Sequence, residues 1–239
     1  LQPDLVFVSH VFFNSGVAVP DLTGLVNKVA EACKATIAVD GYHGFMAIPT
    51  DLSSLEGRIF YLAGSYKYAQ GGEGCCFMLV PEHNNFRPIY TGWFAEFGAL
   101  SAAKTGAVQY STDGYQFAGA TMDFTALYRL RAVLDLYQQE QISTAQVHQH
   151  VQSLQQHFLQ SLDEIAHPWL NRQSLLQNFQ ADHGHFLTFR GPSAEAVAAL
   201  SQFLATHQIK TDYRGDRLRF GFAIYHDLDD IKLAVLKEA

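Results

Sequence analysis

The sequence predicts an α/β domain followed by a smaller α+β domain, and three observations lead to this prediction. The chain has 239 residues, a length that suits one large domain or two small ones. It is 48% hydrophobic and 16% charged, which supplies a packed core and excludes disordered, collagen-like and coiled-coil chains. Short apolar runs alternate with helical stretches over the first 120 residues, whereas the last 60 residues have the pattern of an α+β unit.

Four short apolar runs near the beginning of the chain have the composition of strands. They are rich in β-branched and aromatic residues. Between the first two runs, Asp21–Cys33 is predicted to be a helix, because its apolar residues recur on one face. Nearly all-apolar strands separated by helices are typical of a parallel or mixed sheet, and we expect the first strand to be buried in it. The predicted strands are Leu5–Val8, Thr36–Val39, Arg58–Ala63 and Cys76–Val80.

The alternation of short apolar runs with helical stretches ends after Thr121. A helix is predicted over Phe124–Tyr137, and a longer one begins near Ser143, where apolar residues recur at spacings of three and four. Its other positions (within 138–160) are crowded with Gln and His, which indicates a solvated helix face rather than a low-complexity segment. The elements predicted after it are strand His185–Phe189, helix Ser193–Ala205, strand Arg217–Phe222 and helix His226–Lys237. We place the domain boundary near residue 140, giving domains 1–140 and 141–239.

Charge and composition exclude several classes of partner. Sixteen Lys and Arg against 23 Asp and Glu give a net charge of -7 without a basic run, which argues against nucleic acid or an anionic membrane as partner. No apolar run reaches the roughly 18–20 residues of a membrane span, and no secretory signal pattern opens the chain. Three cysteines are too few for a disulfide framework and fit a reducing compartment. We therefore expect a soluble, cytoplasmic protein.

Two residues at predicted strand ends could carry chemistry. Lys67 follows the third strand and precedes a glycine-rich turn; it is either a surface lysine or an amine whose pKa is lowered by burial for nucleophilic work. Asp40 ends the second strand, where ligands of α/β sheets bind, although an Asx turn would also explain it. A carboxylate and an amine on neighbouring strand ends form the layout that pyridoxal phosphate needs, since one acid pairs with the ring nitrogen and one lysine binds the aldehyde.

Four ordered segments resemble one enzyme family. Asp40–His43 (DGYH), Gly64–Gly74 (GSYKYAQGGEG), Thr91–Phe94 (TGWF) and Leu218–Tyr225 (LRFGFAIY) are similar to segments of the fold-type I, class V pyridoxal-phosphate enzymes, with kynureninases closest in wording. Their order and spacing agree along essentially the whole chain. The resemblance implies a transferase-like large domain, built on a mostly parallel sheet with helices, and a small α+β domain.

The resemblance also implies a role for each matching residue. Lys67 would bind pyridoxal 5'-phosphate and move the Cα proton of the substrate, and Asp40 would pair with the ring nitrogen. Arg219 would bind the α-carboxylate of the amino-acid substrate with two parallel hydrogen bonds, although a pair of solvated charges, Arg217 and Arg219, on an edge strand is the ordinary alternative. The remaining expected cofactor-binding residues are His43 beside the ring, Tyr66 at the phosphate, Trp93 at the phosphate or the substrate, and Thr121 at the phosphate of a neighbouring subunit.

The family implies two further features of the whole molecule. A homodimer is expected, because family members place cofactors at the subunit interface. Family members also have a section before the first strand, which holds a phosphate turn and a residue that stacks on the cofactor ring. Residues 1–239 contain no counterpart, so we expect this chain to be the C-terminal portion of such an enzyme.

Histidines suggest a weaker alternative. His183 and His185 alternate on one strand beside Asp182, a spacing that can ligate a metal, but no third ligand is evident and no metal is expected. His148 and His150 fall on different faces of the long helix and are predicted to be solvated.

Three hypotheses for function follow. The main one is a pyridoxal-phosphate enzyme that acts on an amino acid, either a kynureninase-like hydrolase or a class V aminotransferase. The second is a cysteine desulfurase or selenocysteine lyase relative, which needs a nucleophilic cysteine shortly before Arg219, where residues 195–218 have none. The third is a non-catalytic remnant of the fold. Binding of the cofactor separates the third hypothesis from the others.

Overall fold

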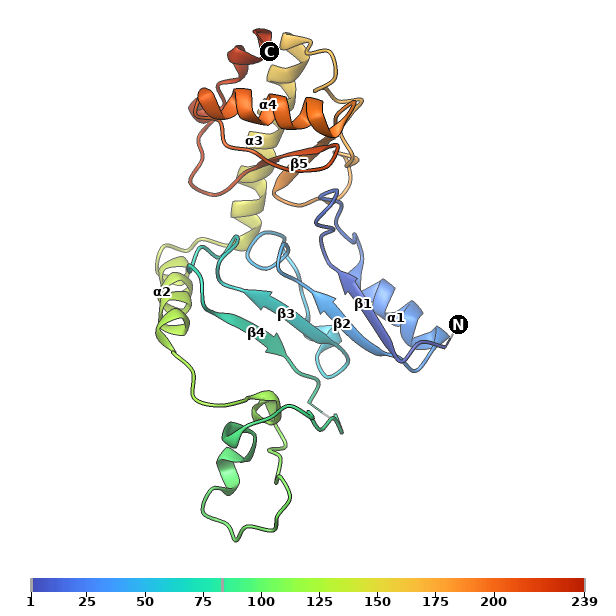
Figure 1. Cartoon of the computed structure of the whole chain (residues 1–239), viewed down its shortest axis with the longest axis vertical. Coiled ribbons are helices and arrows are strands. Elements are labelled where there is room, and N and C mark those ends of the chain that lie inside the picture. The colour runs from blue at the N-terminus through green and yellow to red at the C-terminus, as the bar shows by residue number, and fades with distance from the viewer. Residues whose placement is uncertain (1, 83, 239) are drawn as a thin grey trace.

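The computed structural model describes residues 2–82 and 84–238 and contains two separate β-sheets. Strands β1 to β4 form the first sheet, and strands β5, β7 and β6 form the second, which lies beyond the upper edge of the first in Figure 1. The predicted α/β arrangement followed by an α+β arrangement is confirmed. In the described part of the chain, no helix has the length and apolar character that crossing a membrane requires.

The first sheet is mixed. Strands β1 (Leu5–Ser9), β2 (Thr36–Asp40) and β3 (Phe60–Gly64) are parallel, and β4 (Cys76–Leu79) runs antiparallel to β3. Helix α1 (Leu22–Ala32) connects β1 to β2 and packs on the sheet through Leu22 and Val26. Because the three parallel strands end at one edge, the segments that follow them meet there, and this edge holds four of the predicted site residues, Asp40, His43, Tyr66 and Lys67.

One expectation about the first strand was wrong. Leu5 and Phe7 of β1 are 56% and 59% exposed, although the strand was predicted to be buried. Strand β1 is the outer strand of the sheet, and successive side chains of a strand point to opposite faces. The alternate residue Val8 packs on the core, whereas no described element covers Leu5 and Phe7.

Helix α2 (Thr125–Gln139) packs against the turn after β3. Ala126 and Leu130 contact Ala69 and Cys75, and Arg129 donates a hydrogen bond to the carbonyl oxygen of Gly71 at 3.2 Å. Before α2, a segment with two 3₁₀ turns (Trp93–Ala99 and Gly114–Phe117) projects away from both sheets, as the green trace in Figure 1 shows.

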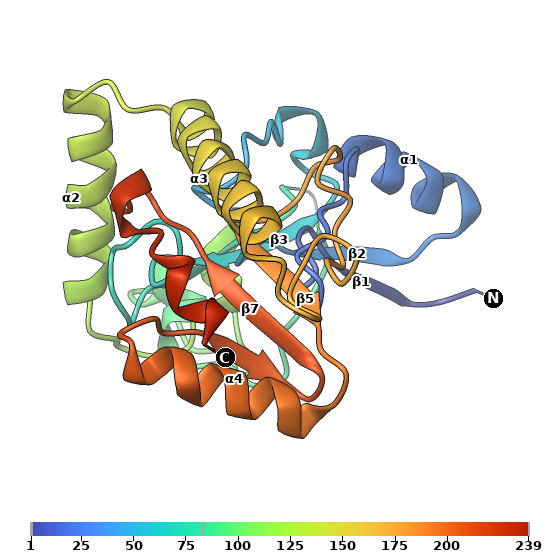
Figure 2. The same cartoon turned by 90° about the horizontal axis from the view of Figure 1, so that it is seen from above.

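The second sheet is antiparallel and shares one apolar core with two helices. It consists of β5 (Phe186–Arg190), β7 (Arg217–Gly221) and β6 (Asp212–Arg214), with β7 in the centre. Helix α3 (Thr144–Ile165) and helix α4 (Ala194–Thr206) lie beside β7 when the molecule is seen from above (Figure 2), and both contribute to this core. Ser143 and Gln146 form a capping box at the start of α3, and Ser193 caps α4.

Two features at the C-terminal end differ from the sequence prediction. The helix expected over His226–Lys237 is a pair of 3₁₀ turns, Leu228–Asp230 and Leu233–Lys237. The side chain of Asp230 accepts a hydrogen bond from the backbone N–H of Asp227 at 2.8 Å, and Ile231 leaves the helical region of backbone angles. Aspartate side chains compete in this way with helical hydrogen bonds, and the helix is broken in the middle. Strand β6 was not predicted.

The two sheets lie on either side of residue 140 along the sequence, since α2 ends at Gln139 and α3 begins at Thr144. We call the elements up to the end of α2 the first unit and those from the start of α3 the second unit. The division into domains 1–140 and 141–239 stays a prediction.

The core of the second unit gives a first testable prediction. Leu159 of α3 is fully buried, so Leu159→Ala should leave a cavity and lower the free energy of unfolding by about 2–5 kcal/mol. The matched control is Leu136→Ala on α2, a leucine that is half exposed and should change stability by less than about 1 kcal/mol. Urea unfolding of both variants measures the two values, and equal losses would contradict this description of the core.

Candidate functional site

A cleft of about 1220 Å³ lies where the segments after β2 and β3 face the second sheet. Four of the predicted site residues line it: His43, Tyr66 and Lys67 from the first unit and Arg219 from β7. The structure therefore brings together residues that are more than 150 positions apart in the sequence. Trp93 and Thr121 do not line this cleft.

The turn after β3 holds Lys67 at the rim of the cleft. Ser65 fixes the turn, because its hydroxyl donates to the carbonyl oxygen of Gly72 at 2.6 Å and its carbonyl oxygen accepts from the N–H of Gly71 at 2.8 Å. Gly72 and Gly74 have positive φ angles of 72° and 98°, a backbone region that glycine adopts readily. The glycine-rich turn after Lys67 is thus a structural requirement of the lysine's position.

The amine of Lys67 is half-buried and contacts an imidazole. Its Nζ lies 2.5 Å from Nε2 of His43 and 5.7 Å from the centre of the Tyr66 ring. Burial lowers the pKa of Lys67 from its usual range, and the positive charge of Arg219 adds to this effect, whereas the negative charge of Asp40 opposes it. A lowered pKa makes the unprotonated amine more available as a nucleophile or a base.

His43 is a partly buried imidazole that is neutral at neutral pH. Its burial, followed by the charges of Lys67 and Arg219, lowers its pKa to about 4. Its ring lies among aromatic rings, with the centre of the Phe186 ring at 5.2 Å. When Lys67 donates to Nε2, the imidazole proton sits on Nδ1, which has no partner among the described residues.

Asp40 stands behind the cleft rather than in its lining. Its carboxylate accepts hydrogen bonds from the hydroxyl of Ser9 at 3.1 Å and from the N–H of Tyr42 at 3.0 Å. The bond to Tyr42 is the Asx turn that the sequence allowed as an alternative. The Asx turn uses Oδ1 of the carboxylate, and the bond from Ser9 uses Oδ2.

Arg219 is a buried arginine on the central strand of the second sheet. Only 9% of its surface is exposed, so the alternative of two solvated charges on an edge strand is wrong for this residue. Its Nη1 donates to the carbonyl oxygen of Phe13 at 2.9 Å, and its guanidinium lies 4.1 Å from the centre of the Phe13 ring. Its Nε has no partner within the described ranges. Arg217 is more exposed and donates to the carbonyl oxygen of Asn14 at 3.0 Å.

Trp93 and Thr121 belong to the projecting segment. The Trp93 ring is about half exposed and packs on the rings of Phe94 and Phe97, with centres 4.4 Å and 5.5 Å away. Thr121 is exposed. Neither side chain lines the cleft of its own chain.

The histidines of α3 correct the sequence analysis. His148 and His150 are partly buried and hydrogen-bonded rather than fully solvated, because α3 packs on the second sheet. Nδ1 of His148 lies 3.0 Å from Nε2 of His185 with the rings stacked, and Nε2 of His150 lies 2.9 Å from the carbonyl oxygen of His226. His183 uses both nitrogens for bonds to Ala181 and Gln155. Among the described residues, no group of three side chains could hold a metal ion.

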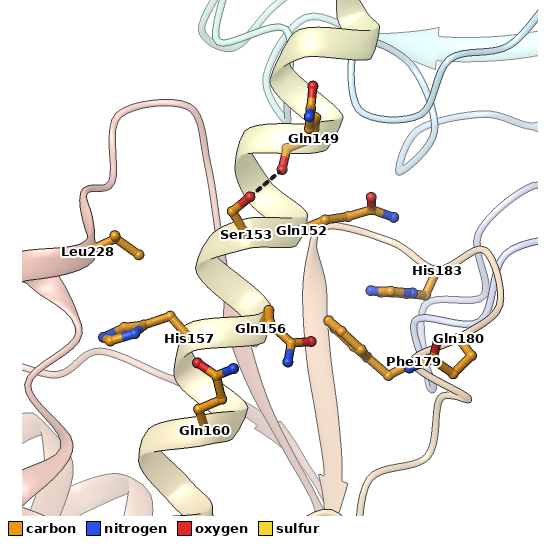
Figure 3. A pocket seen from close by; sticks show the side chains of 10 residues that line it. All are labelled: Gln149, Gln152, Ser153, Gln156, His157, Gln160, Phe179, Gln180, His183 and Leu228. Atoms are coloured by element: carbon orange, nitrogen blue, oxygen red, sulfur yellow. Dashed lines mark hydrogen bonds between the residues drawn. The ribbon is translucent and has the colours of Figure 1, made fainter.

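A second, smaller pocket runs along the polar face of α3. It has a volume of about 570 Å³ and is lined mainly by glutamines, together with His157 and His183 (Figure 3). Figure 3 shows the glutamines of α3, Ser153 and His157 spread along the helix, with Phe179, Gln180 and His183 facing it from a loop and Leu228 from another segment. One hydrogen bond is drawn, from Ser153 to the backbone of Gln149. Ser153 and His157 both line the pocket, but the hydroxyl of Ser153 donates to the backbone of Gln149, and no hydrogen bond joins it to His157 in the described part of the chain. The larger cleft is therefore the candidate active site.

Sequence reasoning missed most of the other residues that line the cleft. Phe13, Tyr68 and Asp212 line it beside the predicted residues. Tyr68 could have been found, because it follows Lys67 directly. Phe13 and Asp212 lie far from Lys67 in the sequence, and only the packing of the second sheet on the loop after β1 brings them to the cleft.

Comparisons with known proteins agree with this fold. The aminotransferase class-V family model matches residues 2–233. No match was found among curated proteins. Among solved structures, the chain is similar to a cysteine desulfurase from Thermococcus onnurineus NA1, with 19% identity over 98% of this chain and 59% of that one and a TM-score of 0.77.

Two further solved structures show the same fold. One is the cystine C-S lyase C-DES in complex with its reaction product, cysteine persulfide, with 22% identity over 100% of this chain and 62% of that one and a TM-score of 0.76. The other is an alanine–glyoxylate aminotransferase from Nostoc sp., with 17% identity over 99% of this chain and 61% of that one and a TM-score of 0.65. The chain thus spans about three fifths of the length of these proteins.

Two histidines that are shielded from solvent, His43 and His185, predict a specific pH dependence of stability. Burial lowers the pKa of His43 to about 4 and, together with the charges of His148 and His183, the pKa of His185 to about 3. Histidines of the unfolded chain have pKa values near 6.5, so the unfolded chain binds more protons below that pH. Stability should therefore be complete above about pH 6.5 and fall as the pH decreases from 6.5 towards 4.

Urea unfolding between pH 4 and 7 measures this slope. His185→Gln should flatten it, whereas His207→Gln, at an exposed histidine after α4, should leave it unchanged. An unchanged slope in the His185 variant would contradict the burial of that imidazole as its cause.

Proposed function

The chain belongs to the aminotransferase class-V family, and from that membership we propose that it forms part of an enzyme that binds pyridoxal phosphate and acts on an amino acid. Enzymes of this family use pyridoxal phosphate. The observation that carries the proposal is the cleft, in which the amine of Lys67 contacts His43 and the guanidinium of Arg219 lines the facing wall.

The residues of the cleft fit this cofactor. The buried Nδ1 of His43 and Nε of Arg219 have no partners among the described residues, and buried polar groups of this kind call for a ligand or water. Lys67 would bind the aldehyde, Asp40 would pair with the ring nitrogen, and His43 and Tyr66 would contact the cofactor from the cleft side. When bound, pyridoxal phosphate supplies an electron-withdrawing ring that stabilises negative charge at the Cα of the substrate.

Side chains of this protein would move the proton, orient the amine and bind the substrate. The amine of Lys67, with its lowered pKa, takes the Cα proton of the amino acid, and the neutral His43 orients that amine by accepting its hydrogen bond. Arg219 binds the α-carboxylate, a planar group that matches the two parallel N–H donors of a guanidinium. Phe13 and Phe186 pack on the guanidinium and exclude water from it, which strengthens the charge interaction.

The reaction after proton removal is proposed from the sequence resemblance. A kynureninase-like hydrolysis or a transamination fits the segments around Asp40, Lys67 and Arg219. The solved cysteine desulfurases favour a desulfurase or selenocysteine lyase relative as the second candidate. Against it, residues 195–218 have no cysteine; the three cysteines are Cys33, Cys75 and Cys76. We also propose a homodimer, in which Trp93 and Thr121 of the projecting segments would reach the partner's cleft.

The role of Lys67 can be tested by chemical trapping. Borohydride reduction of the protein loaded with pyridoxal phosphate should fix the cofactor on Lys67, which peptide mapping identifies. Lys67→Ala should lose the tag and the yellow absorbance of the bound cofactor, because no other amine has this contact with His43 among the described residues. Lys210→Ala is the matched control, since Lys210 also lines the cleft. A tag on Lys210, or cofactor-free wild-type protein, would refute the role and favour a non-catalytic remnant.

Arg219 tests the substrate class. Lysine supplies one point charge in place of two parallel donors, so Arg219→Lys should weaken amino-acid binding by about 1.5–3 kcal/mol, the scale of a hydrogen bond to a charged group. Titration with an amino acid, followed by the cofactor absorbance, measures the dissociation constant. Arg217→Lys is the control and should bind as the wild type does. If Arg219→Lys binds equally well, the carboxylate is held elsewhere.

A further inference from the structure

Arg219 already holds a carboxylate of its own chain. Asp212 stands directly opposite Arg219 in the β6–β7 pair, and Nη2 of Arg219 donates a hydrogen bond to Oδ2 of Asp212. Both residues line the cleft. If Arg219 binds the substrate carboxylate, as proposed above, then substrate and Asp212 bind the same guanidinium.

The surroundings of Arg219 limit where a carboxylate can approach. Nη1 donates to the carbonyl oxygen of Phe13, and the rings of Phe13 and Phe186 pack on the guanidinium. Carboxylate oxygens bind a guanidinium at its N–H edge, in the plane of the group. Asp212 takes part of that edge, so a second carboxylate can use two parallel donors fully only when Asp212 gives way.

The carboxylate of Asp212 has a second hydrogen-bond partner, with which it can stay paired after leaving Arg219. Its Oδ1 accepts a hydrogen bond from Nη1 of Arg214 at 2.9 Å, so one carboxylate bridges two arginines. The side chain of Asp212 is 48% exposed, whereas that of Arg219 is 10% exposed. Asp212 can therefore leave Arg219 and keep both hydration and an ion pair, while the buried Arg219 cannot remain unpaired without a large desolvation cost.

We propose that Asp212 is an internal competitor for Arg219 that sets the affinity of the cleft for carboxylates, with Arg214 as the partner that receives it. In this arrangement Arg219 stays paired and positioned when the cleft is empty. The apparent dissociation constant of a substrate equals its intrinsic value divided by the fraction of molecules in which Arg219 is free. Asp212 acts through Arg219 and is a positioning residue, not a catalytic one.

Opposite effects of two substitutions test this proposal. Asp212→Asn removes the competing charge, so it should lower the dissociation constant of L-alanine by about fivefold, the factor expected for a partly exposed ion pair. Arg214→Gln removes the alternative partner and should raise the constant, because Asp212 then stays on Arg219. In the Asp212→Asn background, Arg214→Gln should have no further effect. A merely structural disturbance of β6 would weaken binding in both single variants.

The measurement uses binding rather than turnover. L-Alanine is titrated into the holoenzyme and followed by the cofactor absorbance, and acetate is titrated into the same protein by calorimetry, with Arg219→Lys as the reference. If Arg219→Lys weakens binding and Asp212→Asn does not tighten it, the competition is refuted while the proposed function stands. If Arg219→Lys changes neither constant, the proposed function fails and this inference fails with it.

Discussion

The loop after β1 is hydrogen-bonded to the second unit, and the cleft depends on these bonds. The carbonyl oxygen of Gly16 accepts from the N–H of Gly184 at 2.8 Å, and the carbonyl oxygen of Phe13 accepts from Arg219 at 2.9 Å. Gly16 has a φ of 72°, and a Cβ there would lie 2.1 Å from Nε2 of Gln177. A residue without a side chain is therefore required where the two units meet, and this contact places Arg219 across the cleft from Lys67.

The electrostatics of the cleft follow from the same contact. Lys67 and Arg219 bring two positive charges into partly buried positions, and each lowers the pKa of His43. Asp40 behind the cleft and Asp212 on β6 supply the opposing negative charges, the latter by direct contact with Arg219. Two cations beside a neutral imidazole suit a ligand that carries negative charge, such as a phosphate or a carboxylate. The chemistry of the cleft is thus set by residues of both units together.

The order and type of most elements could be predicted from the sequence. Apolar runs predicted β1 to β4, β5 and β7, and apolar residues that recur on one face predicted α1, because these signals are local. The C-terminal helix was predicted wrongly, since the hydrogen bonds of the Asp227–Asp230 turn prevailed over helical spacing. The exposure of Leu5 and Phe7 could not be predicted either, because a run of apolar residues does not reveal which strand lies at the edge of a sheet.

For the candidate site, too, some features could be predicted from the sequence and others only from the structure. The resemblance of short sequence motifs to those of a known family predicted Lys67, His43, Tyr66 and Arg219 as site residues, and these four line one cleft. The sequence by itself determined the elements, the glycine-rich turn and the resemblance, because each depends on residues close together in the chain. Only the tertiary structure decided the contact of Lys67 with His43, the pairing of Arg219 with Asp212 and the burial of Arg219. The first joins the loops after β2 and β3, and the second joins the neighbouring strands β6 and β7. The third depends on how the second sheet packs on the loop after β1. That packing joins side chains about 200 residues apart, over which no local pattern carries information.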